Sequence, residues 1–257
     1  MAADLISDDM QQDNPRPDIP PGQLFVIGDS HIGLGVGAEE RIVAWLDRLR
    51  VFEPRELHLN GDVFHYFIGE DKFVTPPVTR FFDKLRELRD SGIGVYYIEG
   101  NRDFFLKGSV AEPAVTAIVD HSVIEAGGRS YYLVHGDMIN DRDYQYRLWR
   151  RASKNPLTRI GVKLFPRALA RGFVNRVEEH LSQTNFKHKY QLPTEQMQIY
   201  GSRRLAEGHD IVVFGHFHEK LVLEEKGSTV VVLPAWFESE EAMVISPDTG
   251  EFQFVRV

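Results

Sequence analysis

The sequence VYYIEGNRDFF at residues 95–105 joins an apolar, aromatic and β-branched run, typical of a buried strand, to an abrupt polar end. The run stops at Gly100, and an amide, a guanidinium and a carboxylate follow it at Asn101, Arg102 and Asp103. Asn and Asp are common turn residues, so a loop with Arg102 in solvent is one explanation of this order. The other explanation is that the strand delivers these groups to a functional site, and the rest of the chain favours it.

Four other strand-like runs also end in side chains that can bind a metal ion. They read LFVIGDSH at residues 24–31, ELHLNGD at 56–62, YYLVHGD at 131–137 and IVVFGHFH at 211–218. Side chains just beyond the carboxyl ends of strands meet in an open α/β sheet, even when they are far apart in sequence. The strand ends therefore predict one cluster, made of Asp29, His31, Asp62, Asn101, His135, His216 and His218.

The donor types in this cluster indicate a metal centre. Imidazole, carboxylate and amide oxygen, without sulfur, suit hard to borderline divalent metals. Seven ligands are more than one tetrahedral zinc ion uses. Each residue alone has a structural explanation, because His216 could be a buried core histidine and Asp62 a turn residue. The coincidence of five such strand ends favours a dinuclear metal site in which one carboxylate is shared.

Composition excludes several other functions. The 257 residues contain no cysteine, so disulfides, thiolate metal sites and cysteine nucleophiles are excluded. No apolar run approaches the roughly 20 residues that span a bilayer. Residues 141–190 contain 12 Lys and Arg against 4 Asp and Glu, whereas the rest of the chain contains 18 against 34. This basic segment predicts an anionic partner, but not nucleic acid, because the acidic body would repel it.

The order of the elements predicts an α/β fold with one main domain. Residues 1–22 read as a disordered or extended tail, and residues 23–257 as the domain. Helices are expected at residues 38–50 and 75–92, and hairpin turns at 127–128 and 248–250. Alternation of strands and helices followed by hairpins favours a layered sandwich. An insertion at about 138–190 is expected to be helical, with helices that start at Pro156, after an Asn155 cap, and at Pro166.

Taken together, the motifs D-x-H, G-D, G-N, H and G-H-x-H resemble those of the calcineurin-like metallophosphoesterases from about residue 24 to the C-terminus. The resemblance implies a β-sandwich flanked by helices and two divalent metal ions, most commonly Mn²⁺. It implies that one metal ion is held by Asp29, His31 and His218, the other by Asn101, His135 and His216, with Asp62 as the bridge.

Further motifs are similar to one branch of this family, the bacterial UDP-2,3-diacylglucosamine hydrolases. They are GNRDF, GDVFHYFIGED at 61–71, DRDYQYRLWRR at 141–151, the P-x9-P spacing of the insertion and VVLPAWFESEEAMV at 231–244. The branch cleaves the pyrophosphate of a lipid-linked UDP-sugar in lipid A synthesis. The resemblance therefore implies a cytoplasmic enzyme, peripheral on the inner face of the bacterial inner membrane. Arg102 replaces a histidine that is common elsewhere in the superfamily, and it suits a phosphate leaving group that needs charge more than a proton.

The same resemblance makes the insertion a helical lid over the acyl chains and the nucleotide. It implies substrate contacts from Asn101, Arg102, Asp143, Tyr146, Leu164, Phe165, Ser182, Asn185 and Lys187. The lid would hold lipid on its apolar face, and its arginines would meet phosphates or an anionic membrane surface. The structural alternative is a helical hairpin that packs on its own core and exposes a solvated basic face.

Two departures from the branch leave a second function open. His65 stands where family members often have an acidic residue, and Glu178 and Glu179 precede Ser182 where the branch has an arginine. These changes favour, as the alternative, a related hydrolase of another nucleotide diphosphate or of a phosphodiester. A scaffold without catalysis is a third possibility, but such a protein would be expected to lose metal ligands, and all seven are present.

Overall fold

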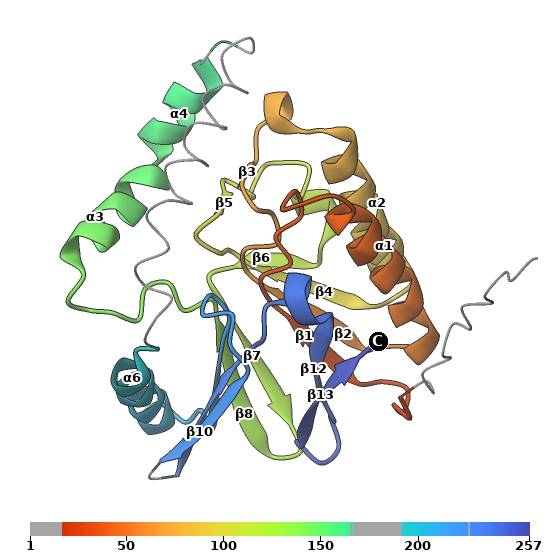
Figure 1. Cartoon of the computed structure of the whole chain (residues 1–257), viewed down its shortest axis with the longest axis vertical. Coiled ribbons are helices and arrows are strands. Elements are labelled where there is room, and N and C mark those ends of the chain that lie inside the picture. Colours follow the sequence, from red (N-terminus) through yellow and green to blue (C-terminus); the bar gives the residue numbers. More distant parts are fainter. Residues whose placement is uncertain (1–16, 165, 167–191, 226) are drawn as a thin grey trace, which may run out of the picture.

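The computed structural model describes residues 17–164, 166, 192–225 and 227–257. Two mixed β-sheets form its centre (Figure 1). The first sheet has the order β13-β12-β1-β2-β4-β6. Its strands are β1 (Leu24–Ile27), β2 (Glu56–Asn60), β4 (Gly94–Ile98), β6 (Ala117–Val119), β12 (Glu241–Ile245) and β13 (Phe252–Arg256). β1, β2, β4 and β6 are mutually parallel, and the hairpin β12–β13 adds to β1 in antiparallel fashion.

The second sheet has the order β10-β11-β9-β8-β7. Its strands are β7 (His121–Ala126), β8 (Arg129–Val134), β9 (Ile211–Phe214), β10 (Leu221–Glu225) and β11 (Ser228–Val232). β8, β9 and β11 are parallel, and the antiparallel strands β7 and β10 form its edges. A short parallel pair, β3 (Phe67–Ile68) and β5 (Asp103–Phe104), follows β2 and β4.

Helices cover both outer faces of the sandwich, with α1 and α2 on one side of the molecule and α6 on the other (Figure 1). The helices are α1 (Ala38–Leu49), α2 (Pro76–Asp90), α3 (Tyr144–Ser153), α4 (Pro156–Leu164), α6 (Thr194–Ala206) and α7 (Trp236–Ser239). Three 3-10 turns, η1 (Arg50–Phe52), η2 (Asp71–Phe73) and η3 (Glu112–Ala114), complete the described elements.

Side-chain alternation in the strands explains these layers. In β1, Phe25 and Ile27 pack with Trp45 of α1 and Phe81 of α2, whereas Leu24 and Val26 pack between the two sheets. A third cluster joins the outer face of the second sheet to α6. Because both faces of central strands such as β1 and β9 meet other layers, apolar residues occur there at consecutive positions. The prediction of a helix-flanked β-sandwich is therefore confirmed.

The predicted turn at Gly127–Gly128 is confirmed, whereas the predicted Thr75 cap and the predicted end of the N-terminal tail need correction. Gly127 and Gly128 turn the β7–β8 hairpin with φ of 55° and 77°, values that glycine adopts without strain. Thr75 occupies the N-cap position of α2, but its side chain makes no capping hydrogen bond. The expected tail ended at residue 22, yet Ile19 packs in the core cluster under α1 and α2. The ordered fold therefore begins before residue 23.

The insertion leaves the sandwich after β8 and is helical where it is described. α4 begins at Pro156 as predicted, and the Asn155 side chain accepts the N–H of Leu157 at 2.8 Å. α3 and α4 form one arm beside β3 and β5 (Figure 1). The helix expected after Pro166 falls outside the described residues. Within the described part of the chain, no helix is both long and apolar enough to cross a membrane.

Sequence reasoning did not separate α3 from the rest of the insertion, and it missed α6. The signals for α6 were Pro193 directly before the helix and Gly208 shortly after its end. Met197, which is fully buried, anchors α6 to the second sheet. The weak amphipathic pattern of this helix explains why the apolar periodicity did not reveal it.

Candidate metal centre

The seven predicted metal ligands lie at the carboxyl ends of parallel strands in both sheets. Asp29 and His31 follow β1, Asp62 follows β2, and Asn101 follows β4 of the first sheet. His135 follows β8, and His216 and His218 follow β9 of the second sheet. Six of these residues fall into two groups whose nitrogen or oxygen ligand atoms lie within 4.8 Å of one another: Asp29, His31 and His218, and Asp62, His135 and His216.

The first group brings two imidazoles and one carboxylate together. His31 Nε2 lies 3.1 Å from His218 Nε2, and Asp29 Oδ1 lies 3.2 Å from His218 Nε2. The Asp29 carboxylate is fully buried, and its Oδ1 has no hydrogen-bond partner. A buried carboxylate oxygen without a donor is costly unless a cation neutralises it. This group therefore fits a metal ion.

The second group is built around His135. Its Nδ1 donates a hydrogen bond to the Asn60 carbonyl at 2.9 Å, so the neutral imidazole presents a lone pair on Nε2. That atom lies 3.0 Å from Asn101 Oδ1 and 3.4 Å from Asp62 Oδ1. With His135 neutral, these three atoms are all acceptors, and their repulsion is relieved by a metal ion among them or by a proton on Nε2. The seventh predicted ligand, Asn101, thus joins this group.

The electrostatics of the two groups favour bound positive charge. Burial lowers the pKa of His31 and of His216 to about 4, so both imidazoles are neutral at pH 7 and available as ligands. Burial opposes a charged His135, but the nearby carboxylates, Asp62 above all, together outweigh burial and raise the pKa of His135 to about 10. A proton at His135 thus takes the position that a cation would otherwise hold.

The two groups are joined through their carboxylates and backbone. Asp29 Oδ2 accepts the backbone N–H of His216 at 2.8 Å, which links the first group to a residue of the second. The backbone carbonyl of Asp62 accepts the N–H of His31 at 3.2 Å. Loops from both sheets are therefore fixed against each other at the centre.

Backbone strain is concentrated at these residues. Asp29, His31, Asp62, His216 and His218 have φ between 44° and 66°, in the left-handed region that residues with a Cβ rarely adopt. Each such residue costs on the order of 1–3 kcal/mol, and such strain persists where the surrounding structure enforces it, commonly at functional sites. Gly100 allows the loops to approach closely, because a Cβ there would lie 2.2 Å from the backbone nitrogen of Asp62.

Arg102 lies beside the predicted bridging carboxylate. Its backbone N–H donates to Asp62 Oδ1 at 2.8 Å, and its Nε lies 3.5 Å from Asp62 Oδ2. Its Nη1 donates to the backbone carbonyl of His65 at 3.1 Å. The residue is only 9% exposed. The explanation that placed Arg102 in a solvent-facing loop is therefore wrong.

His65 connects the guanidinium to the first metal group. Its ring meets the His31 ring edge-on at 5.9 Å between centroids, and its Nδ1 lies 3.4 Å from Arg102 Nη1. Burial and the Arg102 charge lower the pKa of His65 to about 4. A neutral imidazole, and not a carboxylate, therefore separates Arg102 from His31 in this chain.

Three residues support the centre without having been predicted to do so. Asp103 accepts the N–H groups of Gly100 and Val63, and burial together with the Asp62 charge raises its pKa to about 7. Asp137 accepts from Tyr146 and Arg150. Phe237 packs its ring edge-on against His31 and His218, at 5.2 and 5.7 Å. Asp103 and Asp137 follow strands that the sequence predicted, and Phe237 lies in the quoted motif at 231–244, but nothing in that motif predicted its contact with the histidines.

The predicted substrate contacts in the insertion are placed only in part. Asp143 caps α3 by accepting the N–H of Tyr146, and the Tyr146 hydroxyl donates to Asp137 at 2.8 Å. Leu164 is 79% exposed at the end of α4. The other predicted contacts, Phe165, Ser182, Asn185 and Lys187, lie outside the described residues, as do Glu178 and Glu179.

Several cations of the insertion are paired within the protein. The described pairs are Arg147 with Asp141, Arg150 with Asp137, Lys154 with Glu99, and Arg159 with Glu70. Part of the positive charge that predicted an anionic partner is therefore balanced within the protein. Arg151 and Lys163 are exposed and make no ion pair with a described residue.

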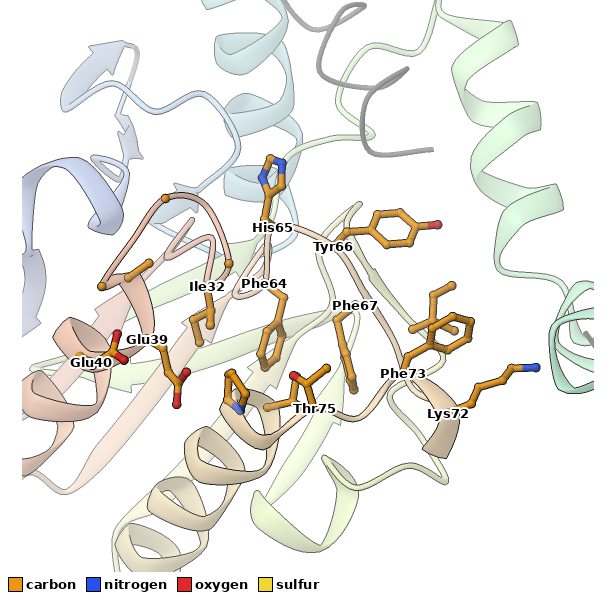
Figure 2. Close-up of a pocket in the computed structure, with 17 residues that line it drawn as sticks. Ile32, Glu39, Glu40, Phe64, His65, Tyr66, Phe67, Lys72, Phe73 and Thr75 are labelled. Atoms are coloured by element: carbon orange, nitrogen blue, oxygen red, sulfur yellow. The ribbon is translucent and has the colours of Figure 1, made fainter. Parts of the chain in front are cut away.

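A groove with a volume of about 520 Å³ opens next to the centre (Figure 2). It runs between the glycine-rich loop at 33–37, the segment that contains Phe64 and Phe67, and the start of α2. In Figure 2, His65 and Phe64 point to opposite sides of the same segment, so that Phe64 lines the interior of the groove. Its lining is mainly apolar and also includes the charged residues Glu39, Glu40 and Lys72.

The chain belongs to the calcineurin-like phosphoesterase family, whose sequence model matches residues 23–220. Members of this family use divalent metals, and the two groups described above can hold them. A UDP-2,3-diacylglucosamine hydrolase from Pseudomonas entomophila is 32% identical over 227 residues, 83% of this chain and 90% of that protein. A protein of the same name from Pseudomonas fluorescens is 30% identical over 258 residues, 97% of this chain and 92% of that protein.

Among solved structures, the hypothetical protein PH1004 from Pyrococcus horikoshii has a similar fold. The TM-score is 0.50 at 11% identity, and the match covers 91% of this chain and 87% of that one. This similarity concerns the fold alone. The predicted family and fold are thus confirmed by the family match and by the architecture of the sheets.

Proposed function

We propose that this protein is a dinuclear-metal hydrolase that cleaves the pyrophosphate of UDP-2,3-diacylglucosamine into UMP and 2,3-diacylglucosamine 1-phosphate. The observation that carries the proposal is the convergence of seven nitrogen and oxygen donors beside the buried guanidinium of Arg102. The names of the relatives at about 30% identity support the choice of substrate.

In this proposal Asp29, His31 and His218 hold one metal ion, and Asn101, His135 and His216 hold the other, with Asp62 shared between them. Donor chemistry without thiolate is compatible with Mn²⁺. Bound divalent ions would polarise the phosphoryl group and lower the pKa of a bound water. The protein contributes fixed ligands, since burial keeps His31 and His216 neutral and their backbone is held in one conformation.

Arg102 is assigned to the charge that develops on the leaving phosphate. Its guanidinium keeps its charge at any pH at which proteins are folded, and it donates hydrogen bonds in a planar fork. The bond from Nη1 to the His65 carbonyl orients the fork, and Asp62 holds its Nε side. A fixed cation beside the ligands can stabilise a transition state without reorganising at the moment of reaction.

The proposal includes a lipid substrate and a peripheral position on the anionic inner face of the bacterial inner membrane, and the exposed apolar side chains of the insertion support a lipid contact. Its helices expose Leu148, Leu157, Ile160 and Leu164, each by more than half. Apolar side chains gathered on one exposed arm commonly mark a lipid or protein contact. The groove beside His65 offers further apolar surface near the centre.

One observation favours the alternative, a hydrolase of another nucleotide diphosphate or of a phosphodiester. Asp143, Tyr146 and Arg150 already have partners within the protein, so they are not free to bind a phosphate or a sugar in this conformation. Such an enzyme would use the same centre and Arg102 but would not need the exposed arm.

A substrate panel tests the two functions. Purified protein with Mn²⁺ is offered UDP-2,3-diacylglucosamine, a chain-free UDP-sugar and a simple phosphodiester, and phosphorus NMR identifies the products. We expect kcat/KM to be highest for the diacylated substrate, with UMP as a product. Equal or faster cleavage of the chain-free compounds would favour the alternative.

A further inference from the structure

Two cations, one in α3 and one at its C-cap, contact the same backbone carbonyl, that of Gly100 after β4. Arg150 Nη2 donates to the Gly100 carbonyl at 2.9 Å, and Lys154 Nζ donates to it at 3.1 Å. Arg150 lies in the last turn of α3, and Lys154 is the C-cap residue directly after the helix, so both reach the carbonyl from the C-terminal end of α3. The carbonyl belongs to the peptide that leads directly into Asn101 and Arg102.

Each cation is also held by a carboxylate of the sandwich. Arg150 Nε lies 2.8 Å from Asp137 Oδ2, and Lys154 Nζ lies 2.8 Å from Glu99 Oε2. Both ion pairs are largely buried, with 6–19% of each side chain exposed. Buried pairs of this kind are costly to break, because removal of one partner leaves the other charge uncompensated. α3 is therefore tied firmly to the ends of β4 and β8.

Gly100 itself is also fixed by contacts on its other side. The Gly100 N–H donates to Asp103 Oδ2, and its Cα is so close to the Asp62 loop that a Cβ would overlap the backbone nitrogen of Asp62. The peptide thus lies between α3 on one side and the Asp62 loop on the other. A shift of α3 would change where Asn101 and Arg102 lie relative to Asp62.

We propose that Arg150 and Lys154 are positioning residues, which set the geometry of the second metal group and of Arg102 through the Gly100 carbonyl. The insertion then has two roles. Arg150 and Lys154 position the loop that carries Asn101 and Arg102, and the exposed arm can also contact substrate. The inference rests on the proposed dinuclear centre, but it does not depend on which phosphate ester or anhydride is cleaved.

Lys154→Met tests this role with little change in side-chain volume. Changes to residues that orient metal ligands typically reduce metal affinity or activity about 10- to 100-fold. We expect the affinity for the second Mn²⁺, measured by calorimetric titration without substrate, to fall about 10-fold. We expect kcat for a chain-free phosphodiester at saturating Mn²⁺ to fall similarly, with KM unchanged. Lys154→Arg, which keeps the charge, should retain most of the Mn²⁺ affinity and most of the kcat of the wild type.

Arg151→Met is the matched control, since Arg151 lies on the same helix but is exposed and makes no ion pair with a described residue. It should leave Mn²⁺ affinity and kcat within about twofold of the wild type. Arg150→Lys, which keeps a charge but lacks the fork that spans Asp137 and Gly100, is the second variant if Lys154→Met does not fold. We expect it to weaken the second Mn²⁺ site in the same way.

Two outcomes would overturn the inference. One is a lower melting temperature with wild-type Mn²⁺ affinity and wild-type kcat, which would make the contacts purely structural. The other is a loss confined to KM for the diacylated substrate, which would restrict α3 to substrate binding. Failure of the wild type to cleave UDP-2,3-diacylglucosamine would instead refute the proposed substrate, and the Mn²⁺ titration would still decide the role of Arg150 and Lys154.

Discussion

Replacement of Leu157 and Leu164 by serine separates a lipid-binding arm from a structural one. The two side chains are 76% and 79% exposed, so the folded protein gains little from burying them. Their loss should change the free energy of unfolding by less than about 0.5 kcal/mol. The arm can therefore be altered without removing any of the described core.

The structure sets the size of the expected effect on the substrate. Full burial of a leucine side chain is worth about 1.5–3 kcal/mol, so covering the exposed three quarters with acyl chains is worth about 1–2 kcal/mol for each leucine. The double variant should lose about 2–4 kcal/mol of binding, which is roughly 30- to 700-fold at 1.4 kcal/mol per tenfold. A chain-free phosphodiester has nothing to bury there and should be cleaved at the wild-type rate.

The assay compares kcat/KM for UDP-2,3-diacylglucosamine and for the chain-free substrate in the same preparations. Val51→Ser is the matched control, because Val51 is 63% exposed but lies in η1, outside the insertion. Circular dichroism confirms that each variant is folded. Equal losses on both substrates, or no loss on either, would refute the reasoning and remove the support for a lipid substrate.

Three further predictions concern the centre itself. Arg102→Ala should reduce kcat/KM about 10- to 150-fold, since a charge-assisted hydrogen bond is worth about 1.5–3 kcal/mol; an unchanged value would dismiss its role in charge stabilisation. Gly100→Ala should lower bound Mn²⁺ below two ions per chain, because its Cβ would overlap Asp62. Gly161→Ala, where a Cβ meets nothing within 4 Å, is its control, and two bound ions in Gly100→Ala would show that the loop can relax. Mn²⁺ at 100 times its dissociation constant should stabilise the fold by about 2.7 kcal/mol per site, read from denaturant unfolding with and without chelator, and identical curves would argue against binding.

The sequence predicted the composition of the centre because its signals are local. Each ligand follows an apolar run directly, and parallel strands bring their carboxyl ends to one edge. The left-handed backbone at Asp29, His31 and Asp62 could not be predicted, because residues with a Cβ disfavour it and only tertiary contacts enforce it. The close approach of Gly100 to Asp62 is likewise invisible without the fold.

Charge in the insertion could be interpreted only in part from the sequence. The excess of Lys and Arg at residues 141–190 predicted an external anion, yet Lys154 and Arg159 pair with Glu99 and Glu70, which are 55 and 89 residues away in sequence. A count of charges along a segment cannot reveal partners on distant strands. α6 was missed for a related reason, because only part of its surface meets the second sheet and its apolar periodicity is weak.

Metal stoichiometry in the wild type and in Asp62→Ala is the most direct test of the dinuclear centre. Metal content and turnover are measured on the same folded samples, with elemental analysis after equilibration in Mn²⁺. We predict two ions per wild-type chain, and loss of metal together with loss of activity in Asp62→Ala, because Asp62 is assigned to both ions. Two bound ions and a wild-type rate in Asp62→Ala would contradict the shared-carboxylate centre.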